Sequence, residues 1–240
     1  METSGRRGFT AFICAMPIEL EPLVRKLSLE ETQLGALTAH VGTPGGRDVV
    51  AIVTGMGTQL ARQHTEQLLD AVAVARVVVV GITGALENET PIGTLIRPEV
   101  VVNSATGTEH RPQPFGEQMP RGTMWTTDVL ITEPEALGAL RQRGVVSLDM
   151  ETAAIAAVCE TRSIPWCVFR VISDRASDGS VDEEVFHLSN QDGTPNHEAI
   201  ASYFAEHPER LPLMARMADD VKRATDAAAE AAITAVMQSR

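Results

Sequence analysis

The chain has 240 residues, of which 44% are hydrophobic, and its formal net charge is −12 at pH 7. This length and apolar content can build one sizeable core, so we expect a single domain over residues 9–240 after a disordered stretch over residues 1–8. The acids are spread along the chain, which disfavours a nucleic acid or an anionic membrane as partner. A small neutral or cationic ligand fits this charge better.

No apolar run approaches the roughly 20 residues that span a bilayer, and residues 1–8 lack the apolar core of a signal peptide. We therefore expect a cytoplasmic protein without a membrane partner. Cys14, Cys159 and Cys167 fall in predicted buried elements and show neither a CxxC motif nor a spacing to histidine that suits a metal. They are predicted to be reduced core residues, and we expect no metal and no cofactor.

In chain order, the first half of the sequence alternates strand and helix patterns. Apolar runs predict strands over residues 9–16, 37–41, 48–54 and 77–81, the second and third joined as a hairpin around Gly45-Gly46. Helices are predicted from Pro17 and after Gly57, where apolar residues recur at helical spacing. The β-branched run at 77–81 is typical of a strand buried on both faces.

The second half continues this alternation. Strands are predicted over residues 125–131, 145–148 and 165–172, and helices over 133–143, from 153 and over 212–238. Thr132 and Glu135 are predicted to form an N-terminal capping box. The segment 103–122 is either a ligand-covering loop or a surface excursion, and the acidic segment 178–197 is either a lid or disordered.

Acidic side chains follow three of the predicted strands. Glu19 follows the first strand, Asp149 and Glu151 follow the strand at 145–148, and Asp174 follows the strand at 165–172. A single acid at such a place usually caps a helix. Three together, at the strand ends where open α/β sheets bind ligands, predict a pocket.

Three of these segments resemble the signatures of a known family. Ala15-Met16-Pro17-Ile18-Glu19, Leu148-Asp149-Met150-Glu151 and Val171-Ile172-Ser173-Asp174, with the glycine-rich stretch from Val79 to Leu86, are similar to the nucleoside phosphorylase and nucleosidase superfamily, and closest to its methylthioadenosine/S-adenosylhomocysteine nucleosidase branch. The resemblance implies an α/β fold, a three-layer αβα sandwich around a central mixed sheet. It also implies a homodimer whose partner subunit completes the pocket for the 5′ group.

The resemblance further implies roles in cleaving the N-glycosidic bond of a purine nucleoside. Asp174 would donate a proton toward N7 of the base, Glu151 would bind the ribose hydroxyls, and Glu19 would orient or deprotonate the attacking water. Met150 would pack against the sugar. The remaining candidate substrate-binding residues are Thr83, Gly84, Leu130, Asp149 and Ser173.

Some positions depart from the family pattern. Asp149 stands where the nucleosidases usually have Glu, Thr83 replaces the usual serine, and Leu130 replaces an aromatic residue that stacks on the base. Either the base lacks that stacking partner, or Trp125 or Phe115 covers it instead. The arginines that hold phosphate in related phosphorylases are missing, which favours water as the nucleophile. A purine nucleoside phosphorylase and a nucleoside-binding protein without turnover stay open as alternatives.

Overall fold

The computed structural model describes residues 8–116, 119–176 and 179–239. Apart from Gly8, the predicted disordered stretch over residues 1–8 lies outside the described residues. The strands are β1 (Phe9–Cys14), β2 (Glu30–Leu34), β3 (Leu37–Gly42), β4 (Val49–Val53), β5 (Val74–Ala85), β6 (Leu95–Ile96), β7 (Val100–Asn103), β8 (Glu109–His110), β9 (Thr123–Thr126), β10 (Val145–Asp149) and β11 (Trp166–Arg175). The helices are α1 (Pro17–Leu27), α2 (Thr58–Ala71), α3 (Pro134–Gln142), α4 (Thr152–Thr161), α5 (Glu183–Phe186), α6 (His197–Glu206) and α7 (Leu211–Gln238).

The described strands form one mixed sheet in the order β2-β3-β4-β1-β5-β10-β9-β7-β8, with β11 paired to β5 and β6. β1, β4, β5 and β11 run parallel, whereas β10 is antiparallel to β5. β3 and β4 pair as the predicted hairpin. The long strand β5 is central, because it pairs with β1, β10 and β11.

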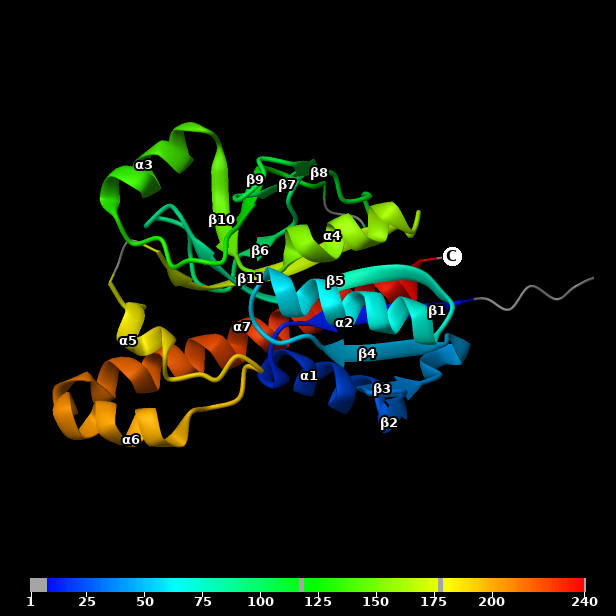
Figure 1. Cartoon of the computed structure of the whole chain (residues 1–240), viewed down its shortest axis with the longest axis horizontal. Helices are drawn as coiled ribbons and strands as arrows, with labels where there is room; N and C mark the ends of the chain where they lie inside the picture. The colour runs from blue at the N-terminus through cyan, green and yellow to red at the C-terminus, as the bar shows by residue number, and fades with distance from the viewer. Residues whose placement is uncertain (1–7, 117–118, 177–178, 240) are drawn as a thin grey trace, which may run out of the picture.

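Helices cover both faces of the sheet, which confirms the predicted three-layer αβα sandwich (Figure 1). Successive residues of a strand point to opposite faces, so in β1 Ile13 packs with α2 and α4, and Phe12 packs with α1 and α7. In β5, Val77 packs on the face covered by α2 and α4, and Val78 packs on the face covered by α1 and α7. The buried β-branched run of β5 therefore forms the centre of two cores.

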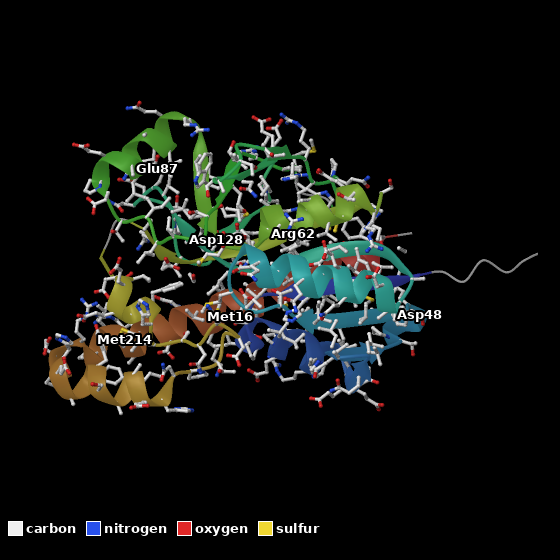
Figure 2. The ribbon with its side chains drawn as sticks, in the orientation of Figure 1. Met16, Asp48, Arg62, Glu87, Asp128 and Met214 are labelled. Atoms are coloured by element: carbon white, nitrogen blue, oxygen red, sulfur yellow. The ribbon has the colours of Figure 1, made fainter. Side chains whose placement is uncertain are left out.

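Two local predictions are wrong. The strand predicted over 125–131 ends at Thr126, because the chain turns and brings Asp128 beside α2 (Figure 2). There Asp128 accepts hydrogen bonds from the Thr58 backbone N–H, at 2.7 Å, and from the Thr58 hydroxyl at the start of α2. Helix α3 has Glu133 at its N-cap without a side-chain cap, so the predicted box of Thr132 and Glu135 does not form. Pro134 at the first helical position fixes this start.

The long helix α7 lies across one face of the sheet and extends past its edge, where α6 packs beside it (Figure 1). Ala224 and Ala228 of α7 are buried against the sheet, whereas Met217 and Val221 line the cavity at the edge of the sheet. The described part of segment 178–197 contains α5, over residues 183–186, and a hairpin over residues 188–196. No helix in the described ranges is long and apolar enough to cross a membrane.

Candidate active site

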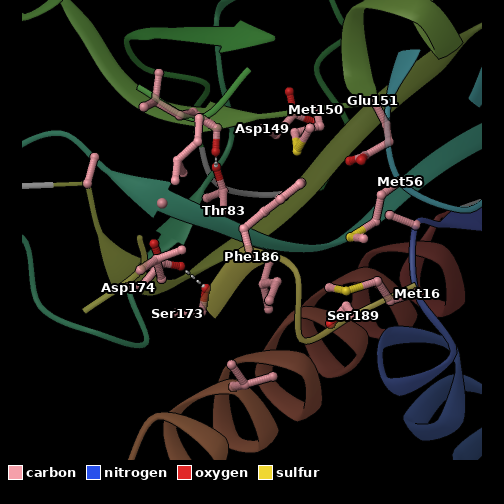
Figure 3. Close-up of a pocket in the computed structure, with 18 of the residues that line it drawn as sticks. Met16, Met56, Thr83, Asp149, Met150, Glu151, Ser173, Asp174, Phe186 and Ser189 are labelled. Atoms are coloured by element: carbon pink, nitrogen blue, oxygen red, sulfur yellow. Dashed lines mark hydrogen bonds between the residues drawn. The ribbon is translucent and has the colours of Figure 1, made fainter. Parts of the chain in front are cut away.

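A cavity of about 280 Å³ opens at the edge of the sheet where β1, β5, β10 and β11 end (Figure 3). The nine residues predicted from the sequence to form the site all line it: Glu19, Thr83, Gly84, Leu130, Asp149, Met150, Glu151, Ser173 and Asp174. The parallel strands and β10 bring them together from positions up to 155 residues apart, counted from Glu19 to Asp174. Their individual roles stay predictions.

Glu19 is fixed by backbone donors at the start of α1. Its Oε2 accepts hydrogen bonds from the N–H groups of Ala15, at 2.7 Å, and Met16, at 3.0 Å. Its Oε1 accepts a hydrogen bond of 2.8 Å from the N–H of Ile82 in β5. The carboxylate therefore caps the helix and also ties β1 to β5, and it points toward the cavity in one fixed orientation.

Arg170 lies at the centre of the site, and the sequence analysis missed it. Its guanidinium is buried and lies 3.4 Å from Glu19, 3.0 Å from Asp149 and 3.0 Å from Glu151. Burial lowers the pKa of Arg170, but the three carboxylates outweigh burial and the pKa is raised. The sequence contained one indication of this role, since Arg170 is a lone charge in the apolar run Pro165 to Ile172. A buried arginine needs acidic partners, so its position predicts acids nearby.

Both carboxylate oxygens of Asp149 accept hydrogen bonds from other groups of the protein. Oδ1 accepts a hydrogen bond of 2.6 Å from the Thr126 hydroxyl, and Oδ2 accepts from the Thr152 backbone N–H at 2.9 Å, the Thr152 hydroxyl and Arg170. These bonds join β9, β10 and the start of α4. The geometry favours a role for Asp149 in positioning Arg170 over direct contact with a ligand.

Glu151 is also buried, and its surroundings bring the pKa of its carboxyl close to neutral pH. Burial raises the pKa of its carboxyl to about 7, against the lowering effect of Arg170 and with a further raising effect of Asp149. Its Oε1 accepts a hydrogen bond of 3.0 Å from the N–H of Gly57. Glu151 therefore exchanges a proton close to neutral pH, unlike an acid on the surface.

Asp174 lies on the other side of the cavity from Glu151, next to Ser173 (Figure 3). The Ser173 hydroxyl donates a hydrogen bond of 2.6 Å to Oδ1 of Asp174. Oδ2 lies over Gly84, where a Cβ atom would approach it to 3.1 Å. The hydroxyl of Thr83 donates a hydrogen bond of 2.6 Å to the carbonyl of Leu148, which joins β5 to β10.

The apolar wall of the cavity includes Leu130, which is 36% exposed and lies at the mouth. Trp125 is not among the lining residues: it packs in the core beside α3, with the Arg143 guanidinium 4.5 Å from its ring centre. Phe115 packs in the core that contains α7. Of the described residues of segment 103–122, none lines the cavity, so the structure favours a surface excursion.

The end of the cavity beside Glu151 is formed by sulfur-containing and apolar side chains. Met16, Met56 and Phe186 line it together with Ser189 (Figure 3). Phe186 and Ser189 belong to the segment 178–197, whose described residues are ordered into α5 and the loop that follows. The structure therefore supports the lid interpretation of this segment.

Comparison with known proteins agrees with this geometry. The family model of the phosphorylase superfamily matches residues 10–118 and 107–206. A 5′-methylthioadenosine/S-adenosylhomocysteine nucleosidase of Shewanella denitrificans is 29% identical over 199 residues, which cover 70% of this chain and 86% of the relative. A protein with the same name from Bacillus cereus is 25% identical over 218 residues, which cover 75% of this chain and 94% of the relative.

Solved structures show that the fold is shared. A mutant of the Helicobacter pylori nucleosidase, with 5′-methylthioadenosine in its active site, aligns with a TM-score of 0.72 and 18% identity, covering 97% of this chain and 99% of the other. The futalosine hydrolase of the same organism aligns with a TM-score of 0.71 and 17% identity, covering 96% and 97%.

Proposed function

Because this chain belongs to the phosphorylase superfamily, we propose that it is a nucleosidase, an enzyme that uses water to cleave the N-glycosidic bond of adenosine-type nucleosides with a 5′ substituent. The observation that carries this proposal is the convergence of Glu19, Glu151 and Asp174 on one cavity, in which Arg170 contacts the two glutamates. The names of the relatives and of the structural neighbours, nucleosidases and a futalosine hydrolase, support it.

Cleaving this bond requires a neutral leaving base, and Asp174 is the proposed general acid. Its Oδ1 accepts a hydrogen bond from Ser173 and its Oδ2 lies above Gly84, and from this position the carboxyl would donate a proton toward N7 of a purine. Leu130 lies at the mouth of the cavity and would cover one face of the base. Protonation of N7 draws electrons from the glycosidic bond and leaves positive charge on the sugar.

Glu151 and Glu19 would act on the sugar side. Glu151 would accept hydrogen bonds from the ribose hydroxyls, with Met150 packed against the ring. Glu19 is held by three backbone N–H groups, so its proposed task is to orient the attacking water and to stabilise the developing positive charge. Arg170 and Asp149 would act as positioning residues that hold both glutamates in place.

Water, rather than phosphate, is the proposed nucleophile. Among the described residues that line the cavity, Arg170 is the one cation, and three carboxylates surround it. A phosphate ion would meet repulsion from these acids without a free guanidinium to bind it. This charge balance is the main argument against the phosphorylase alternative.

The 5′ substituent would occupy the end lined by Met16, Met56 and Phe186. With the base near Asp174 and the ribose near Glu151, this is the part of the cavity that remains. Thioether and aromatic side chains favour an apolar group such as a methylthio group, because they offer contacts without hydrogen bonds. The Helicobacter pylori structure contains 5′-methylthioadenosine in its active site, which supports a methylthio group as the 5′ substituent.

We also propose that residues 9–240 act as one domain in a cytoplasmic homodimer. The single connected sheet supports the first point. Val129 and Leu130 are adjacent at the cavity mouth and are 65% and 36% exposed, and an exposed apolar patch next to a site supports a second copy covering it. Light scattering after gel filtration measures the oligomer directly, and a monomeric mass at working concentration would rule out the homodimer.

Base release in phosphate-free buffer tests the proposed reaction. Methylthioadenosine and inosine are incubated with the protein, and free base and free sugar are measured. We expect release of adenine from methylthioadenosine without phosphate. Turnover that requires phosphate and yields a sugar 1-phosphate would establish a phosphorylase, and tight binding without turnover would establish a nucleoside-binding protein.

A further inference from the structure

Residues 188–196, between α5 and α6, form a closed hairpin. The backbone N–H of Asn190 donates to the carbonyl of Thr194 at 2.8 Å, and the N–H of Asn196 donates to the carbonyl of Leu188 at 2.8 Å. Asp192 accepts hydrogen bonds from both the N–H and the hydroxyl of Thr194, at 2.9 and 2.6 Å. Hairpin 188–196 therefore has its own hydrogen-bonded geometry.

Hairpin 188–196 packs directly on the segments after β1 and β4, which contain Met16 and Met56. The N–H of Met56 donates a hydrogen bond of 2.8 Å to the carbonyl of Gln191. A Cβ atom at Gly193 would lie 2.6 Å from Cγ and 2.9 Å from Cα of Met16. No larger residue fits at Gly193 unless hairpin 188–196 shifts away from Met16.

Hairpin 188–196 thus walls the end of the cavity that the proposed function assigns to the 5′ substituent. Ser189 lines this end beside Met16 and Met56 (Figure 3). The described lining offers Arg170 as its one cation, and its charge is already balanced by carboxylates. The carboxylate of an amino-acid tail on the 5′ group would lose water here without gaining a cationic partner, which is costly.

We propose that hairpin 188–196 determines substrate specificity by selecting compact, uncharged 5′ substituents. A 5′-methylthio group fits between Met16, Met56 and Phe186 with the hairpin docked. A 5′ group that ends in an amino acid, as in S-adenosylhomocysteine, requires hairpin 188–196 to lift from Met16. This inference rests on the proposed function and adds selection between two substrates of the same reaction.

The test compares kcat/KM for methylthioadenosine and S-adenosylhomocysteine in the wild-type protein and in Gly193→Ala. We expect the wild type to prefer methylthioadenosine by at least ~10-fold, equal to about 1.4 kcal/mol. Gly193→Ala displaces hairpin 188–196, so the preference should fall several-fold toward unity. In this variant kcat/KM should be lower for methylthioadenosine and higher for S-adenosylhomocysteine than in the wild type.

Gly107→Ala is the matched control. Both glycines have a positive φ, +77° at Gly193 and +71° at Gly107, so an alanine strains the backbone similarly at each. A Cβ at Gly107 would have nothing within 4 Å. Gly107→Ala should therefore keep the wild-type preference, and a similar loss of preference in both variants would overturn the proposal.

A second variant, Asp192→Ala, loosens hairpin 188–196 without adding bulk, by removing both bonds to Thr194. It should lower the preference in the same direction as Gly193→Ala and serves if that variant does not fold. Equal wild-type rates on both nucleosides, or an unchanged preference in the folded variants, would overturn the role of the hairpin while leaving the nucleosidase function intact. If neither nucleoside is cleaved, the proposed function itself fails.

Discussion

A Cβ atom at Gly81 would lie 2.1 Å from Oε1 of Glu19. The carboxylate lies directly against the backbone of β5, in space that every other residue type would fill. Gly81 therefore allows Glu19 to reach the backbone N–H of Ile82, a bond of 2.8 Å that fixes the carboxylate at the cavity. The glycine is required by this close approach, because the atoms in contact are buried and belong to a side chain held at both oxygens.

Gly81→Ala should therefore lower both stability and activity. Overpacking of this kind costs about 1 to 3 kcal/mol, which in a chain of this size lowers the melting temperature by roughly 2 to 12 °C. Displacement of Glu19 should reduce kcat by up to ~10²-fold. Thermal unfolding and base release measure the two effects.

Gly138→Ala in α3 is the control for adding a methyl group, since a Cβ there would have nothing within 4 Å. It should leave activity unchanged and raise stability slightly, because alanine favours the helix by about 1 kcal/mol. If Gly81→Ala matches Gly138→Ala in thermal unfolding and in base release, then Glu19 can move aside without loss of stability or activity.

The sequence predicts much of this arrangement, since strand-end acids and apolar runs report on the sheet and its ligand-binding edge. Arg170 could not be placed by the same reasoning, because a residue in the middle of a strand gives no sign of which loops fold over it. Asp149 appeared to be a ligand-binding acid, and only the contacts with Thr126 and Thr152 show that its oxygens are occupied. Long-range partners of this kind depend on register and packing, which local patterns do not contain.

Asp174→Asn should reduce kcat by at least ~10²-fold, because the amide keeps the shape but cannot act as the proton donor. Purine binding should change little. Ser173→Ala is the companion variant: it removes one hydrogen bond to Oδ1 and leaves the acid in place, so its loss should be smaller. Single-turnover base release separates chemistry from binding, and equal losses in the two variants would argue against Asp174 as the acid.

Glu151 should make stability fall as pH rises. Burial raises its pKa to about 7 in the folded protein, above the 4.5 of an ordinary glutamate, so the folded state binds the extra proton between these values. Its ionised form is therefore disfavoured by folding, and stability is lost as pH increases from about 4.5 to about 7.

Glu151→Gln removes this titration. The melting temperature of the variant minus that of the wild type should therefore increase from pH 5 to pH 8. This trend is expected even if the variant is less stable than the wild type at every pH. Glu66→Gln on the exposed face of α2 controls for the loss of a carboxylate elsewhere. A difference between Glu151→Gln and wild type that is constant across this range would contradict the burial argument.

Leu130→Phe should tighten purine binding. An aromatic contact adds about 0.5 to 1.5 kcal/mol beyond the buried area, which corresponds to an affinity gain of up to about tenfold. Leu130 is 36% exposed at the mouth, so the ring has room. The inhibition constant of adenine measures the gain.

Trp125→Ala is informative beside it, because Trp125 packs in the core next to α3 and does not line the cavity. It should lower stability and leave adenine affinity near the wild-type value. The reverse pattern, with affinity lost in Trp125→Ala and unaffected in Leu130→Phe, would move the base to a different part of the cavity.

The position of α7 has a consequence for biosynthesis. Every described strand of the sheet precedes this helix in the chain, and the apolar face formed by residues such as Phe12, Val78 and Phe169 is covered by α7 together with α1. A nascent chain can pair its strands while this face is still bare, and exposed apolar sheet surface promotes aggregation. Docking of α7 therefore completes the burial of this face and limits the time in which it can aggregate.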